Sequence, residues 1–269
     1  MSNSVSADLF TNLIGMVMEN FTVDNTSKLQ DFQQGVSQFT AYIFLQDTLI
    51  DDEIDWVNET KKDALHLSKL NSVYRQAIIN LLKVFPEDHF FWNYLQQQEA
   101  NFYSYIVKEK SQNIQHDLIS IEDFETMAFA KHSLALVPIK GLELLFKSNH
   151  TYSKIHSLFV PIFCGIQMMD DIDDFSKDKK IGQWNFLQSQ VSELIRSENL
   201  TNDGTLDKFE ERVFYASGLA EEYLLYALEK YKEALEIAKE LQFENLEQWL
   251  SVMIIEFENR ISEVKELMQ

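Results

Sequence analysis

The sequence predicts an all-α protein that folds as one large helical bundle. Only seven of the 269 residues are glycine and three are proline, about a third of the usual frequency, and β-rich folds need these residues in their turns. Apolar residues recur three or four positions apart along nearly the whole chain, as in amphipathic helices. No linker rich in Gly, Pro or Ser divides the chain, so residues 1–269 are expected to form a single domain.

The apolar periodicity predicts about eight helices, and no segment has a strong strand pattern. The helices are expected at about 9–17, 28–56, 63–85, 87–110, 120–147, 152–178, from the turn at 202–204 to 241, and 245–268.

Three prolines and one polar pair predict where helices begin or bend. Pro86 fits the first position of the helix at 87–110, where a missing N–H costs nothing. Ser120 followed by Asp123 fits a helix N-cap. Pro138 is expected to kink its helix or break it in two, and Pro161 to kink the next long helix.

The charge balance excludes some partners. The formal net charge is −20, so phosphate-rich nucleic acids and anionic membrane surfaces should repel the chain. The single cysteine, Cys164, excludes an internal disulfide and fits a reducing compartment. Because no apolar run reaches the length of a membrane span and the N-terminus lacks a basic signal region, we expect a cytoplasmic protein without stable membrane insertion.

Two acidic motifs interrupt the amphipathic pattern in the same way. Both read Asp-Asp-x-x-Asp, and they lie at 51–55 and 170–174. On a helix, residues four apart share a face, and like charges at that spacing destabilise it by roughly 0.2–0.5 kcal/mol per pair. The alternative is that each motif lies on a solvated acidic face. Two copies embedded in apolar sequence favour the binding of a cation instead. Carboxylates without His or Cys suit Mg²⁺, which commonly binds with substrate phosphates.

These motifs resemble those of the class I isoprenoid synthases, a superfamily that includes terpene synthases and polyprenyl diphosphate synthases. The second motif of that superfamily, Gln-x-x-Asp-Asp-x-x-Asp, is matched from Gln167 to Asp174, and Lys131 lies where a diphosphate-binding lysine is expected. The resemblance implies the isoprenoid synthase fold, an allylic prenyl diphosphate as substrate and Mg²⁺ as cofactor. It implies these metal ligands: Asp51, Asp52, Asp55, Asp170, Asp171 and Asp174.

Departures from the superfamily pattern favour a terpene synthase. Chain-elongating enzymes carry arginines around the first motif that hold a second diphosphate, whereas this chain has only four arginines and none nearby. The segment 182–186 is similar to bacterial large-terpene synthases. A chain-elongating or head-to-head synthase remains the first alternative, and an inactive helical partner or lipid carrier of the same fold the second. A homodimer is a candidate assembly.

The catalytic aspartates are expected to be Asp51, Asp55, Asp170 and Asp174. The candidate substrate-binding residues divide into two groups by chemistry. Polar side chains for the diphosphate are Lys131, Gln167, Lys179 and Lys180, the last two in a loop after the second motif that could close on phosphate. Phe39 and Tyr42 precede the first motif and could line the prenyl cavity. Each has a plainer reading, as a solvated lysine run or as ordinary core packing. Asp47, one helical turn before Asp51, is a candidate for a further ligand or a base.

Overall fold

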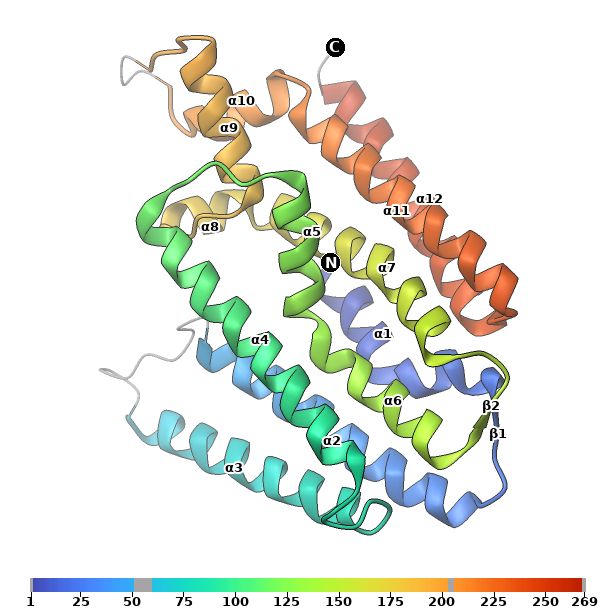
Figure 1. Cartoon of the computed structure of the whole chain (residues 1–269). Helices are drawn as coiled ribbons and strands as arrows, with labels where there is room; N and C mark the ends of the chain where they lie inside the picture. Colours follow the sequence, from blue (N-terminus) through green and yellow to red (C-terminus); the bar gives the residue numbers. More distant parts are fainter. Residues whose placement is uncertain (1, 51–59, 203–205, 268–269) are drawn as a thin grey trace.

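The all-α prediction is confirmed by a computed structural model that describes residues 2–50, 60–202 and 206–267. Twelve α-helices account for most of the described chain (Figure 1). Their bounds are α1 Ser2–Val17, α2 Thr26–Ile50, α3 Thr60–Leu82, α4 Phe90–Gln115, α5 Ile121–Lys131, α6 Leu136–Leu145, α7 Tyr152–Asp173, α8 Phe175–Ile181, α9 Phe186–Ser197, α10 Phe209–Ala216, α11 Leu219–Leu241 and α12 Glu244–Leu267.

The helices surround a core that is rich in aromatic residues. In Figure 1, α7 runs through the middle of the bundle, with α11 and α12 on one side and α5 and α6 on the other. Side chains on α2, α4, α7 and α11 are almost completely buried, among them Phe32, Phe39, Phe91, Phe163 and Tyr231. Burying large aromatic side chains supplies much of the favourable free energy of folding.

Two very short strands join linkers that are far apart in sequence. Strand β1 (Phe21–Thr22) follows α1, and strand β2 (Lys147–Ser148) follows α6. They pair antiparallel, with Phe21 opposite Ser148. The pairing fixes the end of α1 beside the end of α6.

The helix breaks near proline follow the rules for backbone hydrogen bonding. The predicted helix at 120–147 is broken in two, with the 3₁₀ turn Ser133–Ala135 between α5 and α6. Pro138 is the third residue of α6, where an N–H has no intrahelical acceptor. Helix α7 continues through Pro161. The N-cap prediction for Ser120 is confirmed, since its hydroxyl accepts a hydrogen bond of 3.1 Å from the Asp123 N–H.

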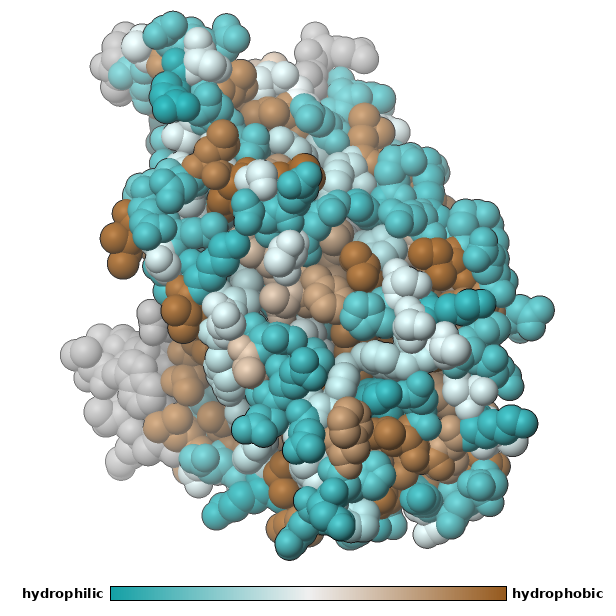
Figure 2. All heavy atoms as spheres, in the orientation of Figure 1, coloured by the Kyte–Doolittle hydropathy of each residue, from teal (hydrophilic) through white to brown (hydrophobic). Residues whose placement is uncertain are grey.

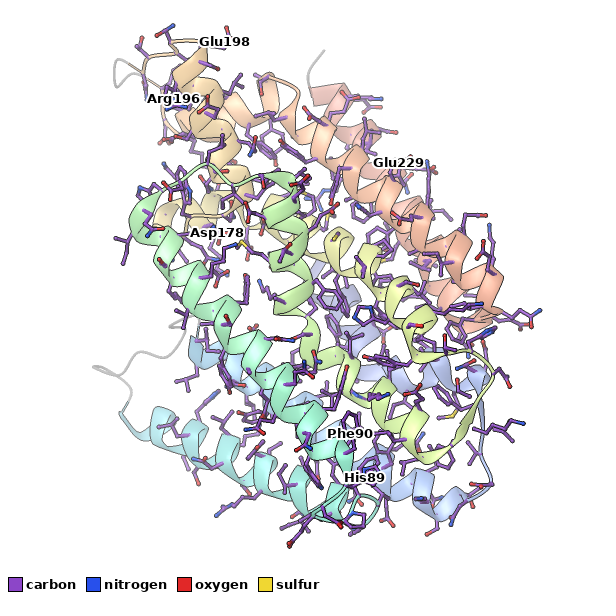
Figure 3. All side chains as sticks on the ribbon, viewed as in Figure 1. His89, Phe90, Asp178, Arg196, Glu198 and Glu229 are labelled. Carbon is purple, nitrogen blue, oxygen red and sulfur yellow. The ribbon has the colours of Figure 1, made fainter. Side chains whose placement is uncertain are left out.

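The predicted role of Pro86 is wrong. Helix α4 begins four residues later, at Phe90. Its N-cap is His89, labelled beside Phe90 in Figure 3, and the His89 Nδ1 accepts a 3.1 Å hydrogen bond from the Phe91 N–H. The imidazole thus replaces the usual Ser or Asp oxygen at this position.

The chain between the second motif and α11 is more broken than predicted. Helix α9 was not expected, and the helix predicted from 202–204 to 241 is divided into α10 and α11. The division falls at Gly218, whose φ of +88° belongs to the left-handed region that glycine adopts readily. The helix predicted to reach 178 ends at Asp173, and α8 follows after Asp174.

Hydrophilic side chains cover most of the face shown in Figure 2, with smaller apolar patches between them. None of the helices in the described ranges combines the length and apolarity needed to cross a membrane.

Candidate functional site

The second acidic motif lies where α7 passes into α8. The Asp174 N–H donates to the Asp170 carbonyl at 2.9 Å, and the Asp178 N–H donates to the Asp174 carbonyl at 2.8 Å. These bonds keep helical spacing across the junction. Asp170, Asp174 and Asp178 therefore follow one another on one side of the chain, as their sequence spacing predicts.

The acidic side chains of this region divide into exposed and buried groups. The side chains of Asp170 and Asp174 are 39% and 35% exposed, so both carboxylates can reach a guest. Asp171 and Asp178 are buried. The Gln167 amide donates to Asp171 at 2.7 Å, and the Asn185 amide donates to Asp178 at 2.9 Å. Asp171, although predicted as a metal ligand, thus turns toward the interior.

Burial also changes the proton affinity of these two acids. Burial raises the pKa of Asp171 well above its usual value, and the charges of Asp170 and Asp178 add to this effect. Burial and the negative charges of Asp174 and Asp170 raise the pKa of Asp178 to about 7. Their amide partners oppose the rise by donating hydrogen bonds to the ionised forms.

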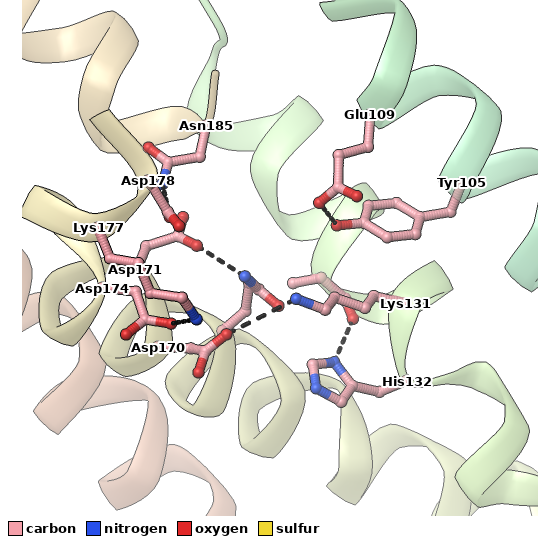
Figure 4. A network of polar contacts seen from close by, with 12 residues as sticks. Tyr105, Glu109, Lys131, His132, Asp170, Asp171, Asp174, Lys177, Asp178 and Asn185 are labelled. Atoms are coloured by element: carbon pink, nitrogen blue, oxygen red, sulfur yellow. Dashed lines mark hydrogen bonds and ion pairs between the residues drawn. The ribbon is translucent and has the colours of Figure 1, made fainter. Parts of the chain in front are cut away.

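Lys131, the last residue of α5, contacts the second motif. Its ammonium lies 3.7 Å from the Asp170 carboxylate, and its side chain is 24% exposed. Burial acts to lower the pKa of Lys131, but neighbouring acidic groups, including Asp170 and Asp171, outweigh it and raise the pKa well above its usual value. Lys131 is therefore a fixed positive charge beside the exposed aspartates (Figure 4).

An apolar cavity of about 120 Å³ adjoins Lys131. Phe39 and Phe44 of α2 line it. Asp47, in the last turn of α2, also lines it, as does Lys131. The cavity therefore joins the end of α2 to the residue that contacts the second motif. Further lining residues that the sequence did not indicate are Phe10, Phe102, His132 and Pro138.

Tyr42 is not among the residues that line this cavity. Its ring packs against Tyr74, with 4.6 Å between the ring centroids, and its hydroxyl lies 3.5 Å from that of Tyr103. Tyr42 thus belongs to the packing of α2 against α3 and α4, which is the plainer of the two readings considered for it.

The first acidic motif lies outside the described residues. Asp51, Asp52 and Asp55 fall within 51–59, and α2 ends at Ile50, directly before them.

The lysines after the second motif lie on a helix and not in the loop that the sequence suggested. Lys179 and Lys180 belong to α8, which ends at Ile181 and is followed by Gly182 with a φ of +76°. Lys177 lies 3.2 Å from Asp174, and Lys179 lies 3.0 Å from Glu210 of α10. Lys180 is exposed. Residues 175–181 thus form a helix.

Several polar residues near the motif come from distant parts of the sequence. Arg260 of α12 pairs with Asp173. The Tyr105 hydroxyl donates to Glu109 at 2.5 Å, and both are buried on α4. The Trp184 indole donates to the Asp117 carbonyl at 2.7 Å and holds the α8–α9 linker against the end of α4. Local sequence patterns carry no signal for these long-range contacts.

Comparison with known proteins gives no relative from which a function could be taken. No protein-family model, no curated protein and no solved structure matches the chain. Within residues 2–50, 60–202 and 206–267, no group of three or more His, Cys, Asp and Glu side chains is arranged to hold a metal ion.

Proposed function

We propose that this protein is a Mg²⁺-dependent class I terpene synthase, which ionises an allylic prenyl diphosphate and converts the cation to a cyclic or linear terpene. One observation carries the proposal. Lys131 lines the apolar cavity together with Asp47 at the end of α2, and it pairs with Asp170 of the second motif. The end of α2, directly before the first motif in the sequence, and the second motif are thereby linked to one apolar space.

The donor atoms suit the proposed cofactor. Asp170 and Asp174 offer partly exposed carboxylate oxygens and no nitrogen or sulfur ligand, a donor set that Mg²⁺ prefers. Together with Asp51, Asp52 and Asp55 they would hold the ions, which supply Lewis acidity to the leaving diphosphate when bound.

The remaining steps fall to the chain's own residues. Lys131 would donate hydrogen bonds to diphosphate oxygens and give up its contact with Asp170 as the carboxylate takes a metal ion. Apolar and aromatic side chains, including Phe39 and Phe102, would exclude water and stabilise an allylic cation through their ring faces.

The cavity has to widen for this substrate. A cavity of about 150 Å³ holds benzene, so 120 Å³ accepts only a small part of a prenyl chain. Phe44 is 39% exposed at the edge of the cavity, and its side chain can rotate without opening the core.

Product analysis tests the proposed reaction. The protein is incubated with Mg²⁺ and allylic diphosphates of increasing length, with and without isopentenyl diphosphate. We expect a terpene from the allylic substrate alone, because the arginines that a second diphosphate requires are missing. Longer prenyl diphosphates that form only when isopentenyl diphosphate is added would contradict this and favour a chain-elongating synthase.

A further inference from the structure

A second, smaller cavity lies between α4, α5 and α7, apart from the apolar cavity. Its volume is about 20 Å³, enough for one atom-sized occupant. We call it the inner pocket. The oxygen-bearing side chains that line it come from three parts of the chain: Tyr105 and Glu109 of α4, Gln167 and Asp171 of α7, and Asn185 before α9. Met127 and Trp184 also line it, and the Trp184 indole already donates to the Asp117 carbonyl.

Two carboxylates share the inner pocket without a cation in its lining. Glu109 and Asp171 are 8% and 5% exposed. The described residues that line the pocket include no Lys, Arg or His. The nearby Lys131 lines the apolar cavity and pairs with Asp170, and its charge also acts on Glu109 and Asp171. Figure 4 shows Glu109 with Tyr105 on one side of Lys131, and Asp171 on the other. Lys131 thus faces three carboxylates, and an excess of buried negative charge calls for a further counter-charge.

Gln167 provides independent evidence for a ligand. Its side chain is 8% exposed, and its Nε2 donates to Asp171 at 2.7 Å, which fixes the orientation of the amide. The Gln167 Oε1 is buried and has no hydrogen-bond partner. Buried acceptors are nearly always satisfied in native proteins. An occupant of the inner pocket that interacts with oxygen lone pairs would satisfy it.

We propose that the inner pocket binds one dehydrated hard cation, K⁺, Na⁺ or Ca²⁺, through oxygens of Glu109, Asp171, Gln167 and Tyr105. The proposed ligands are all oxygens, which suit hard cations better than the softer transition metals. Mg²⁺ gives up its water shell reluctantly and would not fit a space of this size with its waters. The ion would offset negative charge of the two carboxylates and bind α4 to α7 behind the second motif. This inference does not depend on the proposed enzymatic activity.

Thermal unfolding of the full-length protein tests the proposal without any substrate. The protein is dialysed into a tetramethylammonium buffer, and K⁺, Na⁺, Ca²⁺ or Mg²⁺ is titrated against tetramethylammonium chloride of equal ionic strength. At one hundred times its Kd, we expect the bound cation to raise Tm by about 5–10 °C in a saturable manner. Mg²⁺ should give a smaller rise than the best of the other three.

Matched variants locate the effect. Glu109→Gln should abolish the cation-dependent shift, whereas Glu240→Gln, at an exposed position of α11, should retain it. Tyr105→Phe preserves the ring and removes one oxygen, so it should raise the half-saturating concentration about tenfold, and it decides the matter if Glu109→Gln does not fold. Asp174→Asn should retain the shift even where it abolishes binding of Mg²⁺ and diphosphate, which separates this site from the proposed active site.

Two results would overturn the proposal. One is the absence of any saturable shift beyond the salt-matched control, which would mean that the inner pocket holds only water. The other is a wild-type response in both Glu109→Gln and Tyr105→Phe.

Discussion

Lys131 and Asp170 form the contact on which the proposed site depends. Their 3.7 Å ion pair is partly exposed, so it contributes little to the stability of the fold. A diphosphate bound with Mg²⁺ offers each of the two residues a stronger interaction, since the carboxylate can bind the metal and the ammonium can bind phosphate oxygens.

The affinity for inorganic diphosphate tests the role of Lys131. We expect Lys131→Ala to weaken binding at least about tenfold, because a charge-assisted hydrogen bond contributes about 1.5–3 kcal/mol. The matched control is Lys83→Ala, where an exposed lysine on the α3–α4 linker pairs with Asp31. Calorimetric titration with Mg²⁺ and diphosphate measures both variants. Equal affinities would show that Lys131 takes no part in binding.

His132, next in the chain, predicts a pH dependence of stability. Its ring stacks against those of Phe10 and Phe163, and its Nδ1 lies 2.8 Å from the Ala128 carbonyl. Burial and then the charge of Lys131 lower the pKa of His132 from 6.5 to about 4. The folded state therefore takes up this proton less readily than the unfolded state. Its contribution to stability is full above pH 6.5 and is lost as the pH falls toward 4, by about 3 kcal/mol at most.

Urea unfolding between pH 7 and pH 4 measures this contribution. In His132→Gln, the free energy of unfolding should fall less steeply with decreasing pH than in the wild-type protein, since the titrating group is gone. Parallel curves for the two proteins would refute the assignment.

At single positions, the sequence predicted which side chains share a helix face better than it predicted their burial and contacts. The spacing of Asp170 and Asp174 indicated a shared face, which the backbone hydrogen bonds confirm. It could not separate Asp171 from them, because its burial depends on contacts with Gln167 and with other helices. The orientation of Tyr42 toward α3 likewise depends on tertiary packing, which an i, i+4 pattern does not contain.

Among the helices, α7 and α11 pack closely against each other at Gly165. A Cβ atom added at Gly165 of α7 would lie 2.7 Å from the ring of Tyr231 on α11. Tyr231 is almost fully buried, so its ring has little room to move. Glycine at this position therefore permits the approach of the two helices.

Two glycine-to-alanine substitutions in helices test this packing. Gly165→Ala should lower the free energy of unfolding by about 1–3 kcal/mol, because overpacking outweighs the gain in helix propensity. At Gly15 of α1, nothing lies within 4 Å of an added Cβ. Gly15→Ala should therefore be neutral or stabilising by up to about 1 kcal/mol. Urea denaturation measures both, and a stabilised Gly165→Ala variant would contradict the packing argument.

The long helices could be predicted from periodicity, but their interruptions could not. At each break, the backbone leaves the α-helical conformation, as at Gly218 between α10 and α11 and at the 3₁₀ turn after His132. Pro86 misled the prediction because it precedes a turn that ends in the His89 cap. A histidine cap has no strong sequence signature.

For the whole molecule, the net charge of −20 opposes the binding of an anionic substrate. Glu229 on the outer side of α11 and Glu198 at the end of α9 in Figure 3 belong to this acidic surface. Productive binding of a diphosphate thus requires local positive charge, which Lys131 and bound Mg²⁺ would supply.

The fold class could be predicted from composition and periodicity. The apolar cavity could not be predicted, because it is lined by residues from several helices that only the tertiary fold brings together.

Release of diphosphate from allylic prenyl diphosphates, measured with Mg²⁺ and with a chelator, tests the central claim most directly. We predict release that requires Mg²⁺, that falls at least about 100-fold in Asp170→Asn, and that persists in Asp31→Asn, a surface position on α2. Helical content should be unchanged in both variants, because neither substitution opens a cavity in the core. Release that continues in the chelator, or that is as fast in Asp170→Asn as in the wild-type protein, would contradict the account.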